Sequence, residues 1–214
     1  METWDRVAAL RTEFAAQAPD LTPAQWDAPS LCQGWRVRDV VAHLILPEGF
    51  SPFAGLGSLV RAGFRLERAI YRDAVERGCA PVADLLASYR AAIPRRSVPP
   101  GRRPANVLAD LVIHLQDIRR PLGLPWRYDP ELLDQVAGTV HPDKGLGVPR
   151  RVAGLSLRAT DSRWAAGNGA EVSGPTEALI LAMAGRPAAL PELSGPGSAV
   201  LAARISGRGP VRPA

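Results

Sequence analysis

Cysteine and lysine are both scarce in this sequence, and each absence excludes a class of protein. The 214 residues include only Cys32 and Cys79, which are far apart and form no CxxC pair, so neither a disulfide framework nor a cysteine-rich zinc site is expected. Lys144 is the only lysine. The net charge of +5 therefore rests on arginines, which are spread along the chain without interleaved aromatic residues or a recognisable nucleic-acid motif. We expect no nucleic-acid partner.

Long hydrophobic runs are also missing. No stretch approaches the roughly 18 apolar residues that a bilayer-spanning helix needs. The amino-terminal segment alternates charged with apolar residues and has no continuous hydrophobic region. Hydrophobic residues nevertheless make up 46% of the chain, which is enough for a substantial core. We therefore expect a soluble cytoplasmic protein without membrane contact, whose two thiols are reduced.

Helical periodicity dominates residues 1–145. Apolar residues recur at the three- and four-residue spacing of amphipathic helices in five segments, at residues 3–17, 37–44, 58–78, 81–93 and 105–120. The last of these helices is expected to end at Arg120, because Pro121 follows. Four or more such helices with short connections predict a helical bundle.

Residues 146–208 have a different character and predict a small α+β domain. Residues 152–161, VAGLSLRATD, alternate apolar and polar side chains as a strand does, and residues 176–185 have the apolar pattern of a helix. A final strand is expected at residues 198–205, SAVLAARI. Residues 209–214 are expected to form a mobile tail.

Polar side chains form one stripe on the helix predicted at residues 105–120. Asp110, His114 and Asp117 stand at i, i+4 and i+7, beside the apolar face of the same helix. A carboxylate and an imidazole one turn apart can direct an oxygen and a nitrogen to the same metal ion. His43, at the shoulder of the apolar stripe on its own helix, can add a third ligand from a facing helix. Three protein ligands leave a coordination position open, as in catalytic zinc sites.

Each of these features also has a simpler interpretation. A histidine beside an apolar face is commonly a hydrogen-bonded core residue, and Asp and His one turn apart commonly form a surface pair. Asp117 is a ligand, an acceptor for an imidazole N–H, or a partner of Arg119 or Arg120. Cys32, close to a helix amino terminus, is either a reactive thiol or, as we expect, a small buried apolar residue. Neither Cys32 nor Cys79 lies in a motif that would place it beside the two histidines.

Three blocks of the sequence, in this order, resemble a known family. They are LCQGWRVRDVVAHL, DLVIHLQDIRRPLG and EVSGPTEALILAMAGR, and they resemble the mycothiol-dependent maleylpyruvate isomerase family within the DinB-like metal-binding superfamily. The resemblance implies a DinB-like four-helix bundle that binds a divalent metal, commonly zinc, followed by a small carboxy-terminal α+β domain. It matches His43 to the family's first histidine, and Asp110 and His114 to the carboxylate and histidine of a helical pair.

One matched position departs from the family. Asp110 stands where the isomerase has Glu, and its side chain is one methylene shorter. Coordination through Asp110 therefore requires the helix to lie further inward or a water molecule to intervene.

The resemblance also implies a chemistry. The sulfur of mycothiol, or of a similar low-molecular-weight thiol, would add to the conjugated double bond of a small electrophilic substrate, the resulting single bond would rotate, and the thiolate would leave. The metal would favour the thiolate and orient it. Transfer of the thiol to another electrophile is a related reaction. Arg119 or Arg120 would attract an anionic substrate, unless they only compensate the helix dipole. The competing hypothesis is a non-catalytic metal-binding or regulatory protein with the same fold.

Overall fold

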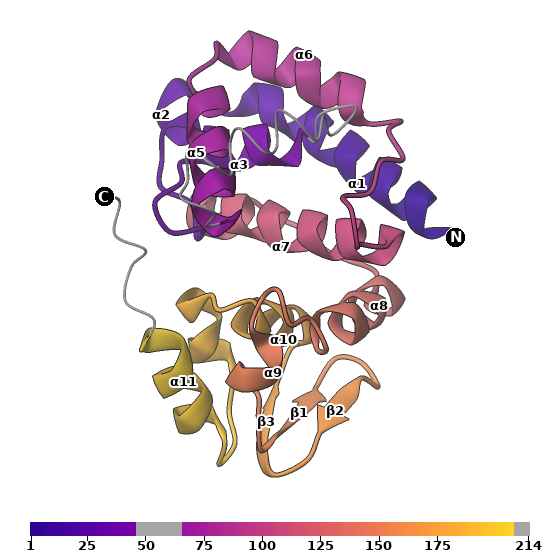
Figure 1. The fold of residues 1–214 in the computed structure, drawn as a ribbon, viewed down its shortest axis with the longest axis vertical. Coiled ribbons are helices and arrows are strands. Elements are labelled where there is room, and N and C mark those ends of the chain that lie inside the picture. The colour runs from indigo at the N-terminus through magenta and orange to yellow at the C-terminus, as the bar shows by residue number, and fades with distance from the viewer. Residues whose placement is uncertain (46–65, 208–214) are drawn as a thin grey trace. The chain divides into compact units, whose positions relative to one another are not determined.

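The structure is a computed structural model that describes residues 1–45 and 66–207 (Figure 1). The chain forms two compact units, Met1–Leu124 and Pro125–Ala214. No helix within the described ranges is long and apolar enough to cross a membrane. The tail expected at residues 209–214 lies outside the described residues, as does the first part of the helix expected at 58–78.

The boundary between the two units lies earlier in the chain than the sequence suggested. The predicted boundary lies near residue 145, whereas the structure divides the chain after Leu124. Helix α8 (Pro130–Val140) therefore belongs to the second unit. It packs against α10 (Thr176–Met183) of that unit.

The first unit is a bundle of four helices with further helical segments around it. The four helices are α1 (Thr3–Gln17), α3 (Val37–Leu44), α6 (Val82–Ala92) and α7 (Pro104–Leu122). Helices α1 and α3 each contact both α6 and α7, so the four helices close a ring around a common core. The other helical segments among the described residues of this unit are η1 (Ala18–Asp20), α2 (Pro23–Trp26) and α5 (Leu66–Gly78). Helix α5 packs against α3. The predicted helical fold is confirmed.

Apolar side chains of these helices fill the core. On α3, Val37, Val40 and Val41 are fully buried, as their helical spacing predicted. Phe14 of α1 meets Tyr89 of α6 edge to face, with ring centroids 5.3 Å apart. Burial of such side chains, on the order of 1.5–3 kcal/mol each, fixes the helices against one another. The polar side chains on α3 and α7 are thereby held in place.

Helix α7 extends past the end that the sequence predicted. It runs to Leu122 and contains Pro121, instead of stopping at Arg120. Proline lacks the N–H that would donate to the carbonyl of Asp117 one turn earlier. That carbonyl instead accepts the backbone N–H of Leu31 at 3.0 Å. The proline therefore leaves a helix carbonyl available to the loop that precedes α3.

The second unit combines a three-stranded sheet with helices. Its strands are β1 (Leu155–Ala159), β2 (Ala165–Gly167) and β3 (Ala170–Gly174). They lie in the order β2-β1-β3, with β1 antiparallel to β2 and parallel to β3. Helix α10 is almost entirely buried and contacts β1 and β3. The remaining helical segments are α9 (Val148–Arg151), η2 (Pro187–Glu192) and α11 (Ser198–Ser206). The predicted α+β character of this part is confirmed.

The final strand expected at residues 198–205 is wrong, because this segment forms α11. Leu201 and Ile205 are four residues apart and both buried, while Val200 is exposed. One buried side chain per turn is the pattern of a helix, whereas a strand buries every second residue. The spacing of the buried residues in this segment is therefore that of a helix.

Candidate metal centre

Two histidines and an aspartate meet where α3 contacts α7. His43 comes from the last turn of α3, and Asp110 and His114 come from the middle of α7. Nε2 of His43 lies 3.5 Å from Oδ2 of Asp110, and Nε2 of His114 lies 3.5 Å from Oδ1. The structure therefore brings together the three residues that the sequence analysis selected, which we call the metal-ligand trio. Asp110 lies between the two imidazoles.

Trp35 forms an apolar wall against both imidazole rings. Its ring centroid lies 5.0 Å from that of His43 and 5.8 Å from that of His114, and the two imidazole centroids are 4.8 Å apart. Trp35 is buried and the His114 side chain is only 10% exposed, but that of Asp110 is 47% exposed. The trio is thus covered by Trp35 and reached from solvent beside Asp110. Sequence analysis did not single out Trp35, which lies outside the helical pattern.

Asp117 lies behind His114. Its Oδ2 is 2.9 Å from Nδ1 of His114, and its side chain is completely buried. When Nδ1 carries the proton and donates it to Asp117, Nε2 keeps its lone pair on the side of Asp110. Among the predicted roles of Asp117, this geometry favours the acceptor for an imidazole N–H.

The surroundings of Asp110 favour its carboxylate form. Partial removal of Asp110 from water raises its pKa, but the charge of His114, the hydrogen bond from His43 and the charge of His43 lower it, and Arg102 acts in the same direction. The combined result is a pKa well below the ordinary value for aspartate. The carboxylate anion is the form that coordinates metal ions.

The trio fits a divalent metal ion. Its ligand atoms all lie within 4.8 Å of one another. In a tetrahedral zinc site with bonds of about 2.0–2.2 Å, neighbouring ligand atoms are about 3.3–3.5 Å apart. The 3.5 Å between Asp110 and each imidazole is close to that spacing. The shorter side chain of Asp110 therefore reaches both histidines from its place on α7.

Cys32 lies beside the same histidine. Its sulfur, a nitrogen of His114 and a carboxylate oxygen of Asp117 all lie within 4.8 Å of one another. The loop that carries Cys32 is held to α7 by the hydrogen bond from Leu31 N–H to the carbonyl of Asp117. Cys32 was expected to be a small buried apolar residue, but it is partly exposed and lies beside His114. No motif along the chain could reveal this neighbour, because it depends on a main-chain bond between a loop and a distant helix.

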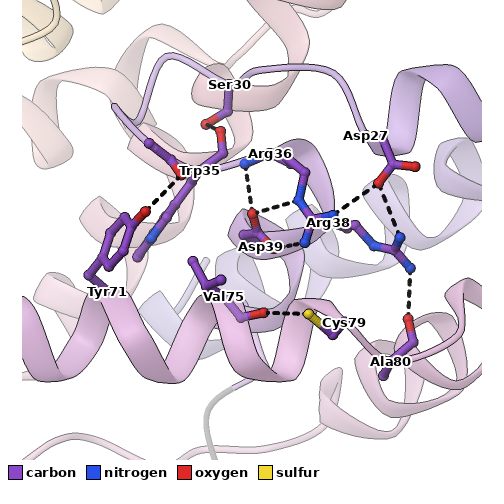
Figure 2. Close-up of polar contacts among 11 residues, drawn as sticks. Asp27, Ser30, Trp35, Arg36, Arg38, Asp39, Tyr71, Val75, Cys79 and Ala80 are labelled. Atoms are coloured by element: carbon purple, nitrogen blue, oxygen red, sulfur yellow. Dashed lines mark hydrogen bonds and ion pairs between the residues drawn. The ribbon is translucent and has the colours of Figure 1, made fainter. Parts of the chain in front are cut away.

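An ion-pair network fixes the start of α3 (Figure 2). Arg36 donates its backbone N–H and its Nε–H to Oδ2 of Asp39, and its Nη2 group to Oδ1, at 2.9 to 3.1 Å. Asp27 accepts from both Arg36 and Arg38. Gly78 of α5 leaves room for this pair, because a Cβ at Gly78 would lie 2.1 Å from Oδ1 of Asp39. The network was not predicted from the sequence. Its only local signal is an Arg and an Asp three residues apart.

The two arginines predicted to attract an anion lie in different surroundings. Arg119 is 1% exposed, and its Nη2 donates to Oε1 of Gln17 on α1 at 3.3 Å. A guanidinium held inside the bundle is not presented to a ligand that arrives from solvent, so the structure does not favour Arg119 for this role. Arg120 is partly exposed, and its role in attracting an anion stays a prediction.

Comparisons with known proteins bear on the family and the fold of the chain. Residues 7–119 match the family model described as the mycothiol maleylpyruvate isomerase N-terminal domain. Two similar solved structures are crystal structures of the mycothiol-dependent maleylpyruvate isomerase. One of them, a mutant with a histidine replaced by alanine, has a TM-score of 0.58 at 16% identity, and the other has 0.57 at 15%. Each comparison covers 100% of this chain and 97% of the other. At this identity the likeness shows a shared fold. No curated protein matches the chain by sequence.

Proposed function

This chain belongs to the mycothiol maleylpyruvate isomerase N-terminal domain family, and on that premise we propose that it is a metal-dependent enzyme using mycothiol or a similar low-molecular-weight thiol. The reaction is the isomerisation of a small electrophilic substrate or the transfer of the thiol to it. The observation that carries the proposal is the convergence of His43, Asp110 and His114 on one point that solvent reaches beside Asp110. We expect the enzyme to work in the cytoplasm, where low-molecular-weight thiols are kept reduced.

The trio would hold a divalent ion, which we expect to be zinc. Two neutral imidazoles and one carboxylate are a donor set that zinc accepts, and they leave one position for a ligand from solvent. When bound, the ion would favour the thiolate form of a thiol at that position and neutralise its charge.

The protein's own residues contribute orientation and shielding. Asp117 fixes the ring of His114 by accepting from its Nδ1, so that Nε2 remains directed toward Asp110. Trp35 packs on both imidazoles and excludes water from that side. Partly exposed Arg120 is the remaining candidate to attract an anionic substrate.

The family also suggests how the thiol would act. Its sulfur adds to one carbon of a conjugated double bond, and the remaining single bond is then free to rotate. Departure of the thiol restores the double bond in the other geometry, so that the thiol is regenerated. Solvent access beside Asp110 is what a thiol and an electrophile would need to reach the site together.

The test is turnover with mycothiol and a panel of electrophiles that includes maleylpyruvate. Metal-loaded protein should turn over at least one of them, and protein stripped by a chelator should not until the ion is restored. The matched control is Cys79→Ser, which alters an exposed cysteine on the end of α5 and should leave turnover unchanged. Turnover that is unaffected by removing the metal would contradict the proposal.

A second candidate is a non-catalytic metal-binding or regulatory protein with the same fold. It is favoured by Asp110, which replaces the Glu of the isomerase. Metal binding by the trio without turnover of any electrophile in the panel would support this candidate over the enzyme.

A further inference from the structure

A second group of possible metal ligands lies around His114. It includes Asp117, which faces Nδ1, whereas Asp110 faces Nε2. Nδ1 of His114 is 2.9 Å from Oδ2 of Asp117, and the sulfur of Cys32 completes a group whose ligand atoms all lie within 4.8 Å of one another. We propose that Cys32, His114 and Asp117 form a second cation site, the thiolate site, which takes a soft, thiophilic divalent ion such as Cd²⁺. The thiolate site is inferred from geometry, and only its effect on the metal-ligand trio rests on the proposed function.

The loop around Cys32 is built to hold the sulfur near α7. The backbone N–H of Cys32 donates to Oγ of Ser30 at 3.1 Å, and its carbonyl accepts the N–H of Trp35 at 3.0 Å. The adjacent N–H of Leu31 donates to the carbonyl of Asp117, which Pro121 has left without a helical donor. The bond from Leu31 thus holds the loop of Cys32 against Asp117, whose carboxylate would be another ligand of the site. These backbone hydrogen bonds, rather than a bond made by the thiol, hold the sulfur beside His114.

The three donors suit a thiophilic ion. A thiolate is a soft ligand that selects soft ions, and an imidazole and a carboxylate complete a mixed set of sulfur, nitrogen and oxygen. On binding, Cys32 would release its thiol proton to solvent, and the thiolate and the carboxylate of Asp117 would together balance the two positive charges. Cys32 is partly exposed, whereas Asp117 is fully buried. An ion can therefore approach from the side of the sulfur.

Occupation of the thiolate site would disable the metal-ligand trio. A neutral imidazole has one proton and one lone pair. Coordination through Nδ1 moves the proton to Nε2, and Nε2 can then no longer bind the ion of the trio. The two sites share His114 but use opposite nitrogens, so each ion excludes the other. A thiophilic ion is therefore expected to inhibit the enzyme by taking His114 from the trio.

The experiment is a titration of metal-free protein with Cd²⁺, followed by the ultraviolet charge-transfer absorption of the cadmium–thiolate bond. Wild-type protein should develop this band and saturate at about one ion per chain. Cys32→Ser and Cys32→Ala should both abolish it, and circular dichroism should show that they remain folded. Cys79→Ser, the matched control for the other cysteine, should keep the full band. His43→Ala should also keep it, because His43 belongs only to the trio.

Three outcomes would overturn the thiolate site: no band in the wild type, an undiminished band in Cys32→Ser, or loss of the band in His43→Ala. The last outcome would mean that the thiolate binds an ion of the trio. Failure of the proposed function has a different signature, since it would appear as zinc content that is unchanged by His43→Ala. The cadmium band does not depend on turnover, so the two results can be read separately.

Discussion

Asp39 and His43 stand one turn apart on α3, yet the polar groups around them differ in how completely they are satisfied. Both oxygens of Asp39 accept N–H groups of Arg36 at 2.9 to 3.1 Å. Around His43, the oxygens of Asp110 lie 3.5 Å from two imidazole nitrogens, and about half of that side chain is exposed. The Arg36–Asp39 pair is saturated with hydrogen bonds. The metal-ligand trio instead directs several lone pairs at one point.

This difference indicates that the first group stabilises the fold and that the second is suited to binding a metal ion. A saturated pair that packs against Gly78 has no capacity for a further ligand, and it fixes the start of α3. The hydrogen bond to Asp39 accordingly raises the pKa of Arg36, which stays charged. In the trio, by contrast, the oxygen and nitrogen lone pairs lack close hydrogen-bond partners and converge on one point. Binding an ion would therefore stabilise this group more than its own contacts do. Substitutions in the two groups should therefore change different measured quantities.

The largest effect is expected from Asp39→Asn. Its amide has only one acceptor oxygen and adds N–H groups where Arg36 also donates, so the buried side chain at position 39 no longer balances the charge of Arg36. We expect the free energy of unfolding, measured by urea denaturation, to fall by about 3 kcal/mol. Metal content of the folded protein should stay at the wild-type level.

The matched control is Asp27→Asn, on the exposed side of the same network. Its free energy of unfolding should fall by less than about 1 kcal/mol. Equal stability of the Asp39 and Asp27 variants would contradict this prediction, because the Arg36–Asp39 pair would then stabilise the fold no more than a surface ion pair does.

Asp117→Asn should act on binding. Without the carboxylate, the ring of His114 loses its fixed orientation, and metal affinity is expected to fall by about 10- to 100-fold. Competition with a chelator measures this change. Asp73→Asn, on the exposed face of α5, serves as the control and should leave affinity unchanged. If both variants bind as tightly as the wild type, Asp117 has no part in the metal centre.

A smaller effect is expected from Pro121→Ala. Alanine restores an N–H that can donate to the carbonyl of Asp117 and so competes with Leu31 for that acceptor. The loop should loosen by about 1 kcal/mol, which corresponds to roughly fivefold faster hydrogen exchange at the amide of Leu31. Metal affinity should fall less than in Asp117→Asn. Unchanged exchange at Leu31 would show that the proline does not hold the loop.

The smallest effect is a pH dependence of the metal-free protein. The folded-state pKa of Asp110 is lowered, so its carboxylate stabilises the fold at neutral pH, and this contribution is lost as the pH falls below about 4. Between about pH 6 and pH 3, wild-type protein should therefore lose more stability than Asp110→Asn. Urea midpoints across this range measure the difference. Equal losses would mean that the histidines do not stabilise the Asp110 anion.

The ligand pattern on α7 could be predicted because it is local. Asp110, His114 and Asp117 fall on one side of a helix by spacing alone. His43 could be proposed as the third ligand because it stands at the edge of an apolar stripe in a predicted bundle, and the family resemblance matched the same residue. The end of α7 was predicted wrongly because the rule for proline considers only bonds within the helix, whereas Leu31 supplies the donor from a loop.

Contacts made by residues outside the helical patterns could not be predicted. Cys32 and Trp35 reach the histidines through a loop whose shape depends on main-chain bonds. Asp39 is buried only because Gly78, far along the chain, leaves space for it. In the second unit, the segment of α11 was predicted as a strand, although its buried side chains are helically spaced.

We propose that His43, Asp110 and His114 hold a divalent ion, whereas Arg36 and Asp39 stabilise the fold. Elemental analysis of freshly purified wild type, His43→Ala and Asp39→Asn, each confirmed as folded by circular dichroism, tests it most directly. We expect about one ion per chain in the wild type and in folded Asp39→Asn, and loss of most of it in His43→Ala. Equal metal content in the wild type and His43→Ala would contradict the claim.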